Sequence, residues 1–312
     1  MFKQDFMGIL KGLAMFLVLP LLLCQPGPAR AGRVPLGEEA APARLLIGLI
    51  PEMNIFKQKQ RFEVLGKYLA EKTGIPLEFT ILSRYGNIIE RFTAEKMDGA
   101  FFGSFTGALA IRKLGVIPLA RPVNLDHTST YQGYLLVRKD SGIKSVADMR
   151  GKRMAYVERA TTAGYLFPLA FLRANSIGDP DNFFSEFFHA GSHDAAIMAV
   201  LDGQADVGAA KHSMYDRVGE NNPRVAAELT IIARSPAVPS NGLCVRNTLA
   251  PSVREKLKQA LLNLGKDPAA APVLAKLGAL EFIETTSADY QPVFDMARQA
   301  GIDIKNYNYL NN

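Results

Sequence analysis

Short apolar runs alternate with segments of helical spacing along most of this chain. Apolar residues fill most of the runs 45–50 and 99–102, as expected for strands buried on both faces. Between such runs, apolar residues recur three or four positions apart, as with Phe62, Leu65 and Leu69, which predicts amphipathic helices. The alternation of strand and helix predicts an α/β fold of mostly parallel sheets flanked by helices.

The pattern places the individual elements. Strands are predicted at 45–50, 77–82, 99–102, 134–137, 154–157, 184–188, 205–209 and 229–233. Helices are predicted at 62–73, from 88, at 104–114, at 145–149, from 161, and at 194–201, 251–264 and 292–300.

The order of elements predicts two lobes. One comprises residues 44–130 and 236–312, the other residues 131–235, and extended crossings near 128–134 and 234–242 join them. Ligands of such folds bind beyond the carboxyl ends of the strands, and two lobes add a cleft between them. We therefore expect a ligand cleft between the lobes.

The start of the chain has the pattern of an export signal. Lys3 and Lys11 make it basic, and the apolar run 13–23 is short for a membrane span. Ala29-Arg30-Ala31 has the small-x-small pattern of a cleavage site, so residues 1–31 are predicted to be removed and 32–43 to form a flexible leader. This predicts a periplasmic protein.

Cys24 supports an alternative, in which a lipid is attached at a cysteine that ends the apolar run. Lipoprotein processing favours a small residue before that cysteine, whereas this chain has Leu23. Once the signal is removed, Cys244 is the only cysteine, so no internal disulfide is expected.

Net charge excludes one class of partner. The formal charge of the 312 residues is +6, of which the signal contributes +2, and no basic stripe interleaved with aromatic residues is present. Nucleic-acid binding is therefore not expected. A mild positive field suits an anionic ligand.

The segment 160–165 carries the clearest candidate chemistry. An apolar strand leads into Thr161, Thr162, Ala163 and Gly164, which open a helix. The first N–H groups of a helix lack partners within it, and the helix dipole places partial positive charge there. Two hydroxyls add donors and the glycine admits close approach, so the segment suits a small oxyanion. A simple helix N-cap explains the same residues.

With these elements placed, seven phrases together resemble the periplasmic binding proteins of phosphonate, phosphite and phosphate ABC importers, over roughly residues 44–295. Each phrase alone is weak, and the ordered set is specific. The phrases are LLIGLIPE at 45–52, RYGNIIE at 84–90, DGAFFG at 98–103, KDSGI at 139–143, TTAGY at 161–165, GSHDAA at 191–196 and GQADVGA at 203–209.

The resemblance implies a two-lobed type II periplasmic binding protein that closes on an oxyanion and presents it to a membrane permease. It implies no enzyme activity, cofactor or metal, and a monomer is expected. The implied ligand-binding residues are Thr161, Thr162, Ala163, Gly164, His193, Tyr131 and Tyr85. Ala163 stands where many members carry a third hydroxyl.

Two further features come from the residues themselves. Ser104 and Thr106 follow Gly103 at a strand end and form a second candidate anion-facing turn, although a Ser N-cap explains them equally. Asp206, between small residues at a strand entry, is expected to accept backbone or hinge hydrogen bonds rather than contact ligand.

The resemblance also narrows the ligand. Family members that take aminoalkyl phosphonates carry acidic residues at the stretches that here read 210–213 and 240–242, where this chain has none. A buried ammonium without a counter-charge is costly, so such ligands are disfavoured. Lys211 or His212 would favour a more negative ligand if either faces the cleft; both could instead face solvent. Phosphate, phosphite or a simple alkylphosphonate is expected.

Two alternative functions remain. An enzyme is the less favoured, because the four histidines have no metal-ligand spacing, Cys244 lacks a nucleophile signature, and no phosphate loop is present. A sensor module of the same fold would differ from an importer component only in its partner.

Overall fold

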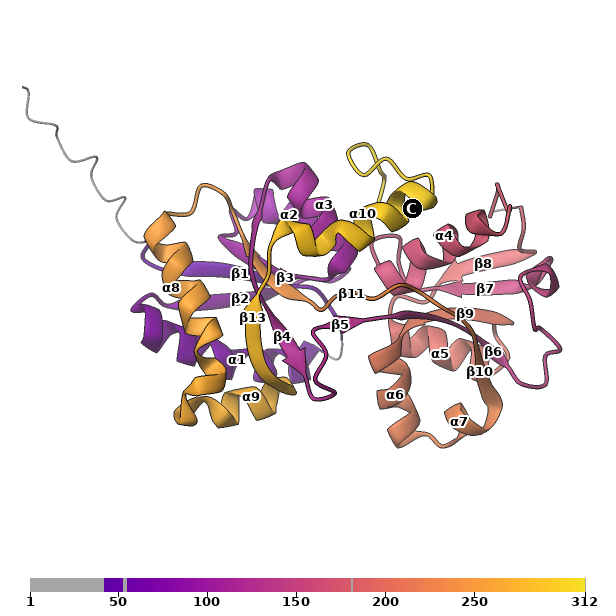
Figure 1. Ribbon diagram of the computed structural model, residues 1–312, viewed down its shortest axis with the longest axis horizontal. Helices are drawn as coiled ribbons and strands as arrows, with labels where there is room; N and C mark the ends of the chain where they lie inside the picture. Colours follow the sequence, from indigo (N-terminus) through magenta and orange to yellow (C-terminus); the bar gives the residue numbers. More distant parts are fainter. Residues whose placement is uncertain (1–41, 53–54, 181, 312) are drawn as a thin grey trace, which may run out of the picture. The chain divides into compact units, whose positions relative to one another are not determined.

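The computed structural model describes residues 42–52, 55–180 and 182–311. The predicted signal peptide, Cys24 and the predicted leader up to residue 41 lie outside these ranges. The described part of the chain holds no helix that is both long and apolar enough to cross a membrane. Two sheets, each flanked by helices, form the body of the protein (Figure 1).

The first sheet has six strands in the order β13-β4-β12-β3-β1-β2. β1, β2 and β3 are mutually parallel, and β12 is inserted antiparallel between β3 and β4, so four strands share one direction. The strands are β1 (Leu45–Leu49), β2 (Leu77–Ile81), β3 (Gly99–Phe102), β4 (Ile117–Asn124), β12 (Gly242–Val245) and β13 (Ala279–Glu284).

Helices cover this sheet because each has one apolar face. α1, α8 and α9 pack together and bury Leu65 and Leu257 against Leu45 and Leu243 of the sheet. The helices are α1 (Ile55–Thr73), α2 (Asn87–Ala94), α3 (Ser104–Leu114), α8 (Pro251–Leu262), α9 (Ala271–Leu277) and α10 (Gln291–Gln299), with 3-10 turns at Leu264–Lys266, Pro268–Ala270 and Ser287–Tyr290.

The second sheet has five strands in the order β10-β6-β9-β7-β8. β7, β8 and β9 are parallel, and β6 is inserted antiparallel between β9 and β10. Its elements are β6 (Gly133–Arg138), β7 (Arg153–Tyr156), β8 (Glu186–His189), β9 (Val207–Lys211), β10 (Leu229–Arg234), α4 (Phe167–Ala174), α5 (His193–Leu201), α6 (His212–Asn221), α7 (Arg224–Glu228), a 3-10 turn at Ala147–Met149 and a π-turn at Thr162–Leu166.

Two chain crossings join the sheets. β5 (Thr130–Tyr131) and β11 (Val238–Pro239) pair antiparallel in a two-stranded ribbon between them (Figure 1). The segment after α10 also contacts both halves, since the Tyr307 ring packs on Phe105 of α3 and its hydroxyl donates to Arg159 O after β7. One apolar cluster runs continuously from Phe105 through Tyr131 into β6 and α5.

The α/β prediction is confirmed, and most strands of each sheet share one direction, although each sheet contains an inserted antiparallel strand. The sequence patterns did not predict β4, β12 or β13. Pro118 and Pro122 lie within β4, and proline normally argues against a central strand because it lacks the ladder N–H. The predicted crossing 234–242 ends where β12 begins, and no element was predicted at 243–245.

Candidate functional site

Strands that run in the same direction end at the same edge of their sheet, so the turns that follow them lie close together. From the first sheet, Glu52 follows β1, Tyr85 follows β2 and Ser104 follows β3. From the second sheet, Thr161 follows β7, His193 follows β8 and Lys211 ends β9. All six line one pocket between the two sheets. This is the position at which α/β folds bind ligands.

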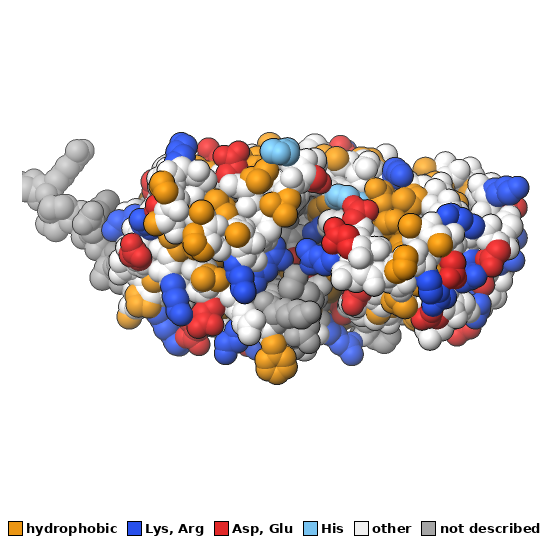
Figure 2. Space-filling view, turned by 90° about the horizontal axis from the view of Figure 1, so that it is seen from below, with side chains coloured by type: hydrophobic (Ala, Val, Ile, Leu, Met, Phe, Trp, Pro, Cys, Tyr) orange, Lys and Arg blue, Asp and Glu red, His pale blue; other side chains and the backbone are white. Residues whose placement is uncertain are grey.

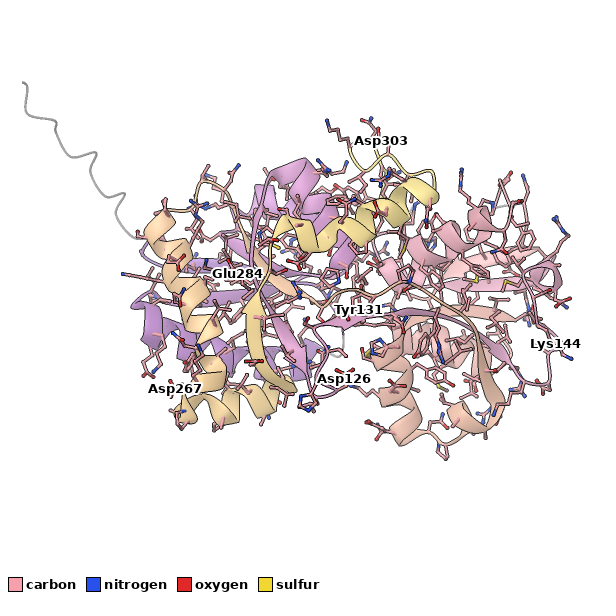
Figure 3. All side chains as sticks on the ribbon, viewed as in Figure 1. Asp126, Tyr131, Lys144, Asp267, Glu284 and Asp303 are labelled. Atoms are coloured by element: carbon pink, nitrogen blue, oxygen red, sulfur yellow. The ribbon has the colours of Figure 1, made fainter. Side chains whose placement is uncertain are left out.

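The pocket is small, about 270 Å³, which suits a small ligand rather than a drug-sized one. Tyr131 contributes to its wall from the ribbon between the sheets, where Figure 3 labels it. It meets a larger groove of about 1270 Å³ with a charged lining, seen as blue and red side chains beside the central hollow in Figure 2. The described residues that line the pocket are Ile50, Glu52, Tyr85, Gly103, Ser104, Phe105, Thr106, Tyr131, Ala160, Thr161, Thr162, His193, Lys211 and Asn241.

Most of the predicted site residues meet here. Tyr85, Ser104, Tyr131, Thr161, Thr162 and His193 all line the pocket, and Thr106 does too. Ala163 and Gly164 are buried but are not part of its lining. The structure therefore places six of the eight predicted residues around one cavity.

Two buried hydroxyls at the pocket have no hydrogen-bond partner among the residues that the structure describes. The Tyr85 Oη and the Thr162 Oγ1 are each enclosed, and the two residues are only 4% and 3% exposed. Leaving a buried polar group unpaired costs about 1–3 kcal/mol. Two such groups on one small cavity mark it as a place where a ligand supplies the missing acceptors.

Other pocket hydroxyls already donate hydrogen bonds to acceptors within the protein. Thr161 Oγ1 donates to Glu158 O at 2.6 Å, so without ligand only the Thr162 hydroxyl of this pair lacks an acceptor among the described residues; the prediction that Thr161 binds ligand stays a prediction. Ser104 Oγ lies 2.6 Å from Pro239 O and 2.8 Å from Tyr131 Oη. Because a carbonyl only accepts, Ser104 donates to Pro239 and the Tyr131 phenol donates to Ser104.

His193 is held as a neutral donor. Its Nδ1 accepts the Lys211 backbone N–H at 3.2 Å, which assigns the ring proton to Nε2. Burial, and next the nearby Lys211 charge, lower the pKa of His193 to about 4. Its ring lies edge-on to Tyr85, with centroids 6.2 Å apart. A neutral imidazole and a phenol thus face one another across the two lobes.

This predicts a pH-dependent stability. The unfolded chain protonates His193 near pH 6.5 and the folded chain only near pH 4, so the unfolded state binds more protons between these values. Stability should fall as the pH is lowered from 6.5 towards 4, by up to roughly 3 kcal/mol from this group. Urea unfolding of the ligand-free protein at pH 7.5 and 5 measures it.

The matched variant is His193→Asn, whose amide oxygen can still accept the Lys211 N–H. Burial raises the pKa of Glu158, which contributes the opposite dependence in both proteins, so the difference between the two proteins isolates His193. An equally steep pH dependence in His193→Asn would contradict a neutral buried imidazole.

An ion pair that the sequence did not predict spans the pocket. Glu52 of the first sheet lies 3.3 Å from the Lys211 ammonium of the second, and that ammonium sits 4.5 Å above the Tyr131 ring. Burial raises the pKa of Glu52, but the charges of Lys211 and Arg61 and hydrogen bonds from Lys211 and Asn241 outweigh it, so its pKa stays below the usual value.

The sequence left open whether Lys211 faces the cleft or solvent, and the structure places it at the pocket. His212 instead lines the neighbouring groove, where its Nδ1 accepts the Gln132 N–H at 3.0 Å. Asp206 accepts the Arg153 backbone N–H at 2.9 Å and pairs with its guanidinium, which confirms the structural role predicted for it. The one sequence signal for Glu52 as a pocket residue is its position just after the central strand β1.

A buried carboxylate holds Tyr85 in position. Glu158 of the second lobe is 5% exposed, and its Oε2 accepts the Tyr85 backbone N–H at 3.1 Å. Burial, together with the negative charges of Glu52 and Glu158, raises the pKa of Tyr85 well above its usual value. The Tyr85 phenol is therefore a neutral donor throughout the physiological range.

The turn after β7 is a π-turn rather than the start of a regular helix. Leu166 N donates to Thr161 O at 3.1 Å, and α4 follows directly. Short π-turns frequently occur at functional sites. Gly164 fits here because a Cβ on it would lie 2.4 Å from the Val157 side chain. Close packing of the turn on the strand is thus a structural reason for glycine here, and its role in admitting a ligand stays a prediction.

Gly164→Ala should destabilise the protein by about 1–3 kcal/mol, because the added methyl overlaps Val157 and the turn must shift. Denaturant unfolding of the ligand-free protein measures this. Gly178→Ala is the control, since a Cβ there meets nothing within 4 Å. Equal stability of both variants would show that the turn has room.

The chain matches a known protein family. The model of the family described as ABC transporter, phosphonate, periplasmic substrate-binding protein matches residues 47–290. The chain belongs to this family. Members are substrate-binding proteins of ABC transporters and not enzymes.

Two curated relatives and one solved structure agree. The chain is 29% identical over 233 residues to the phosphate-import protein PhnD of Mycolicibacterium smegmatis, covering 70% of this chain and 71% of that protein. It is 25% identical over 268 residues to the phosphonates-binding periplasmic protein of Escherichia coli, covering 84% and 78%. The structure of PhnD1 from Prochlorococcus marinus in complex with methylphosphonate matches with a TM-score of 0.72 at 22% identity, covering 83% and 98%. The protein therefore has the two-lobed type II periplasmic binding fold.

Proposed function

We propose that this protein captures a small phosphorus oxyanion (a phosphonate, phosphite or phosphate) in the pocket between its lobes and delivers it to an ABC permease. The observation that carries the proposal is the pair of buried, unpartnered hydroxyls, Tyr85 Oη and Thr162 Oγ1, at one small cavity. They come from different lobes, so an anion that accepts from both holds the lobes together.

The donors that face the pocket suit an oxyanion. Tyr85, Thr162 and the His193 Nε2–H are neutral donors, and the Lys211 ammonium adds positive charge. Hydrogen bonds to a charged acceptor contribute about 1.5–3 kcal/mol each. Tetrahedral oxyanions offer several oxygens in different directions, which matches donors that converge from two sheets.

We propose lobes of residues 44–130 with 236–312 and of residues 131–235. The sheet memberships support this division, because β6 to β10 share one sheet, β1 to β4 with β12 and β13 share the other, and β5 and β11 form the ribbon between them. The β5–β11 ribbon would flex when the lobes open, and the surroundings of Tyr131 on this ribbon would change when they close. We propose that the protein acts as a monomer in the periplasm.

The pocket carboxylate bears on ligand choice. Glu52 lies where an aminoalkyl phosphonate could place its ammonium, but its carboxylate is already paired with the Lys211 ammonium at 3.3 Å. An ammonium would have to displace Lys211 before it could pair. Phosphorus oxyanions without an ammonium group therefore remain the expected ligands, and 2-aminoethylphosphonate the weaker one.

A thermal-shift series tests the proposal. Phosphate, phosphite, methylphosphonate, 2-aminoethylphosphonate, sulfate and bicarbonate are added separately to the protein. A ligand that binds only the folded state raises the Tm in proportion to the logarithm of its concentration over its Kd. A large shift with at least one phosphorus oxyanion, and a smaller one with sulfate or bicarbonate, is expected. No shift with any phosphorus oxyanion would overturn the proposal.

A further inference from the structure

A second hollow, a cavity smaller than the groove, lies in the first lobe, and none of the predicted site residues lines it. Its wall is largely apolar and is built by the β1 strand, by helix α1 and by the strands β3, β4 and β13. The apolar side chains that line it include Leu49, Phe62, Phe101, Pro122, Ala279 and Phe282. A concave apolar site with a few polar groups is the usual form of a small-molecule site.

Two polar groups at this cavity lack some of their hydrogen-bond partners, as far as the described ranges 42–52, 55–180 and 182–311 supply them. Gln58 is 3% exposed; its Nε2 donates to Ile50 O at 2.6 Å, while its Oε1 has no partner. Arg61 donates from one end of its guanidinium to Leu277 O, while its buried Nε has no partner. The cavity thus offers one acceptor and one donor within an apolar wall. A ligand hydroxyl or amide would satisfy both.

The cavity adjoins the anion pocket. Ile50, Glu52 and Asn241 line both spaces, and Glu52 and Asn241 also line the groove between the lobes. Cavity, pocket and groove therefore meet at these two side chains. The cavity therefore lies on the Glu52 and Asn241 side of the anion pocket.

We propose that this cavity is the subsite for the organic substituent of the ligand. The substrate class is then a phosphonate or phosphate monoester that bears an aromatic ring or short branched chain, with one hydroxyl or amide for Gln58 and Arg61. The inference rests on the proposed function, because it needs the anion pocket to hold the phosphorus group. Inorganic phosphate or methylphosphonate would leave the cavity unused.

Isothermal titration with two probes that share a head group tests this. Phenylphosphonate should bind roughly ten- to a hundredfold tighter than methylphosphonate, because its ring is removed from water in the cavity. In Ala279→Leu, which fills the cavity, the advantage should disappear while the methylphosphonate Kd stays the same. Equal affinities of the two probes for the unaltered protein, or an equal loss for both in the variant, would overturn the subsite.

A crystal grown with 4-bromophenylphosphonate gives a readout that does not depend on the variant's folding. The anomalous bromine signal should lie among Phe62, Phe101 and Phe282. Bromine in the open groove overturns the subsite but leaves the proposed function intact. Binding of neither methylphosphonate nor phenylphosphonate in the titration overturns both, so the two failures are distinguishable.

Discussion

Tyr85→Phe should weaken binding of the phosphorus oxyanion about ten- to a hundredfold and should not destabilise the ligand-free protein. The hydroxyl that it removes has no partner in the described part of the chain, so its loss removes a cost of about 1–3 kcal/mol rather than a bond. In the complex the same hydroxyl would donate to a charged oxygen, a bond of about 1.5–3 kcal/mol. Affinity by calorimetry and Tm without ligand measure the two effects.

Tyr68→Phe is the matched control. The Tyr68 hydroxyl donates to Asp267 at 3.1 Å, and Tyr68 is not among the residues that line the pocket. Its loss should lower the Tm and leave the ligand Kd unchanged, the reverse of the result for Tyr85. Unchanged affinity in Tyr85→Phe would mean that the unpartnered phenol does not contact ligand.

Lys211→Met should lower affinity about a hundredfold. Lys211 carries the one positive charge among the described residues that line the pocket, and its removal leaves the Glu52 carboxylate unpaired beside the anion. Loss of one partner of a close charge pair typically costs 2–5 kcal/mol at an interface. Methionine keeps the apolar stem over the Tyr131 ring, so the effect of charge is separated from that of packing.

Lys139→Met changes the net charge equally and should leave the affinity within a factor of about two, since this exposed side chain only donates to Ala226 O. Glu52→Gln provides the opposite test, because it removes the negative charge and frees Lys211 for the ligand. Its affinity should exceed that of Lys211→Met by at least tenfold. Equal losses in both would indicate that the pair only holds the lobes together.

The sequence by itself determined the elements whose apolar pattern is unambiguous. The helix at 104–114 was predicted with the bounds it has, and β1, β3, β7 and β10 were predicted to within two residues at either end. It also determined which segments carry the chemistry, because Thr162, His193 and Tyr85 each follow a predicted strand or lie at the start of a predicted helix. The α/β class and the cleft at strand ends follow from the alternation alone.

The tertiary structure decided what these residues do. Whether a hydroxyl is free depends on acceptors far away in sequence, so only the fold separates Thr162, which is unpartnered, from Thr161, whose proton goes to Glu158 O. The same holds for Gly164, whose missing Cβ is explained by Val157 across the turn.

The fold also decided the electrostatics of the pocket. Glu52 and Lys211 are 159 residues apart, and no local pattern marks them as a pair; they meet because β1 and β9 end on opposite sides of one cavity. β12 is central in its sheet although only four residues long, since pairing with β3 and β4 compensates for a weak local signal. Local patterns fix the period and burial of a segment, whereas hydrogen-bond partners and charge pairs are properties of distances that only the folded chain sets.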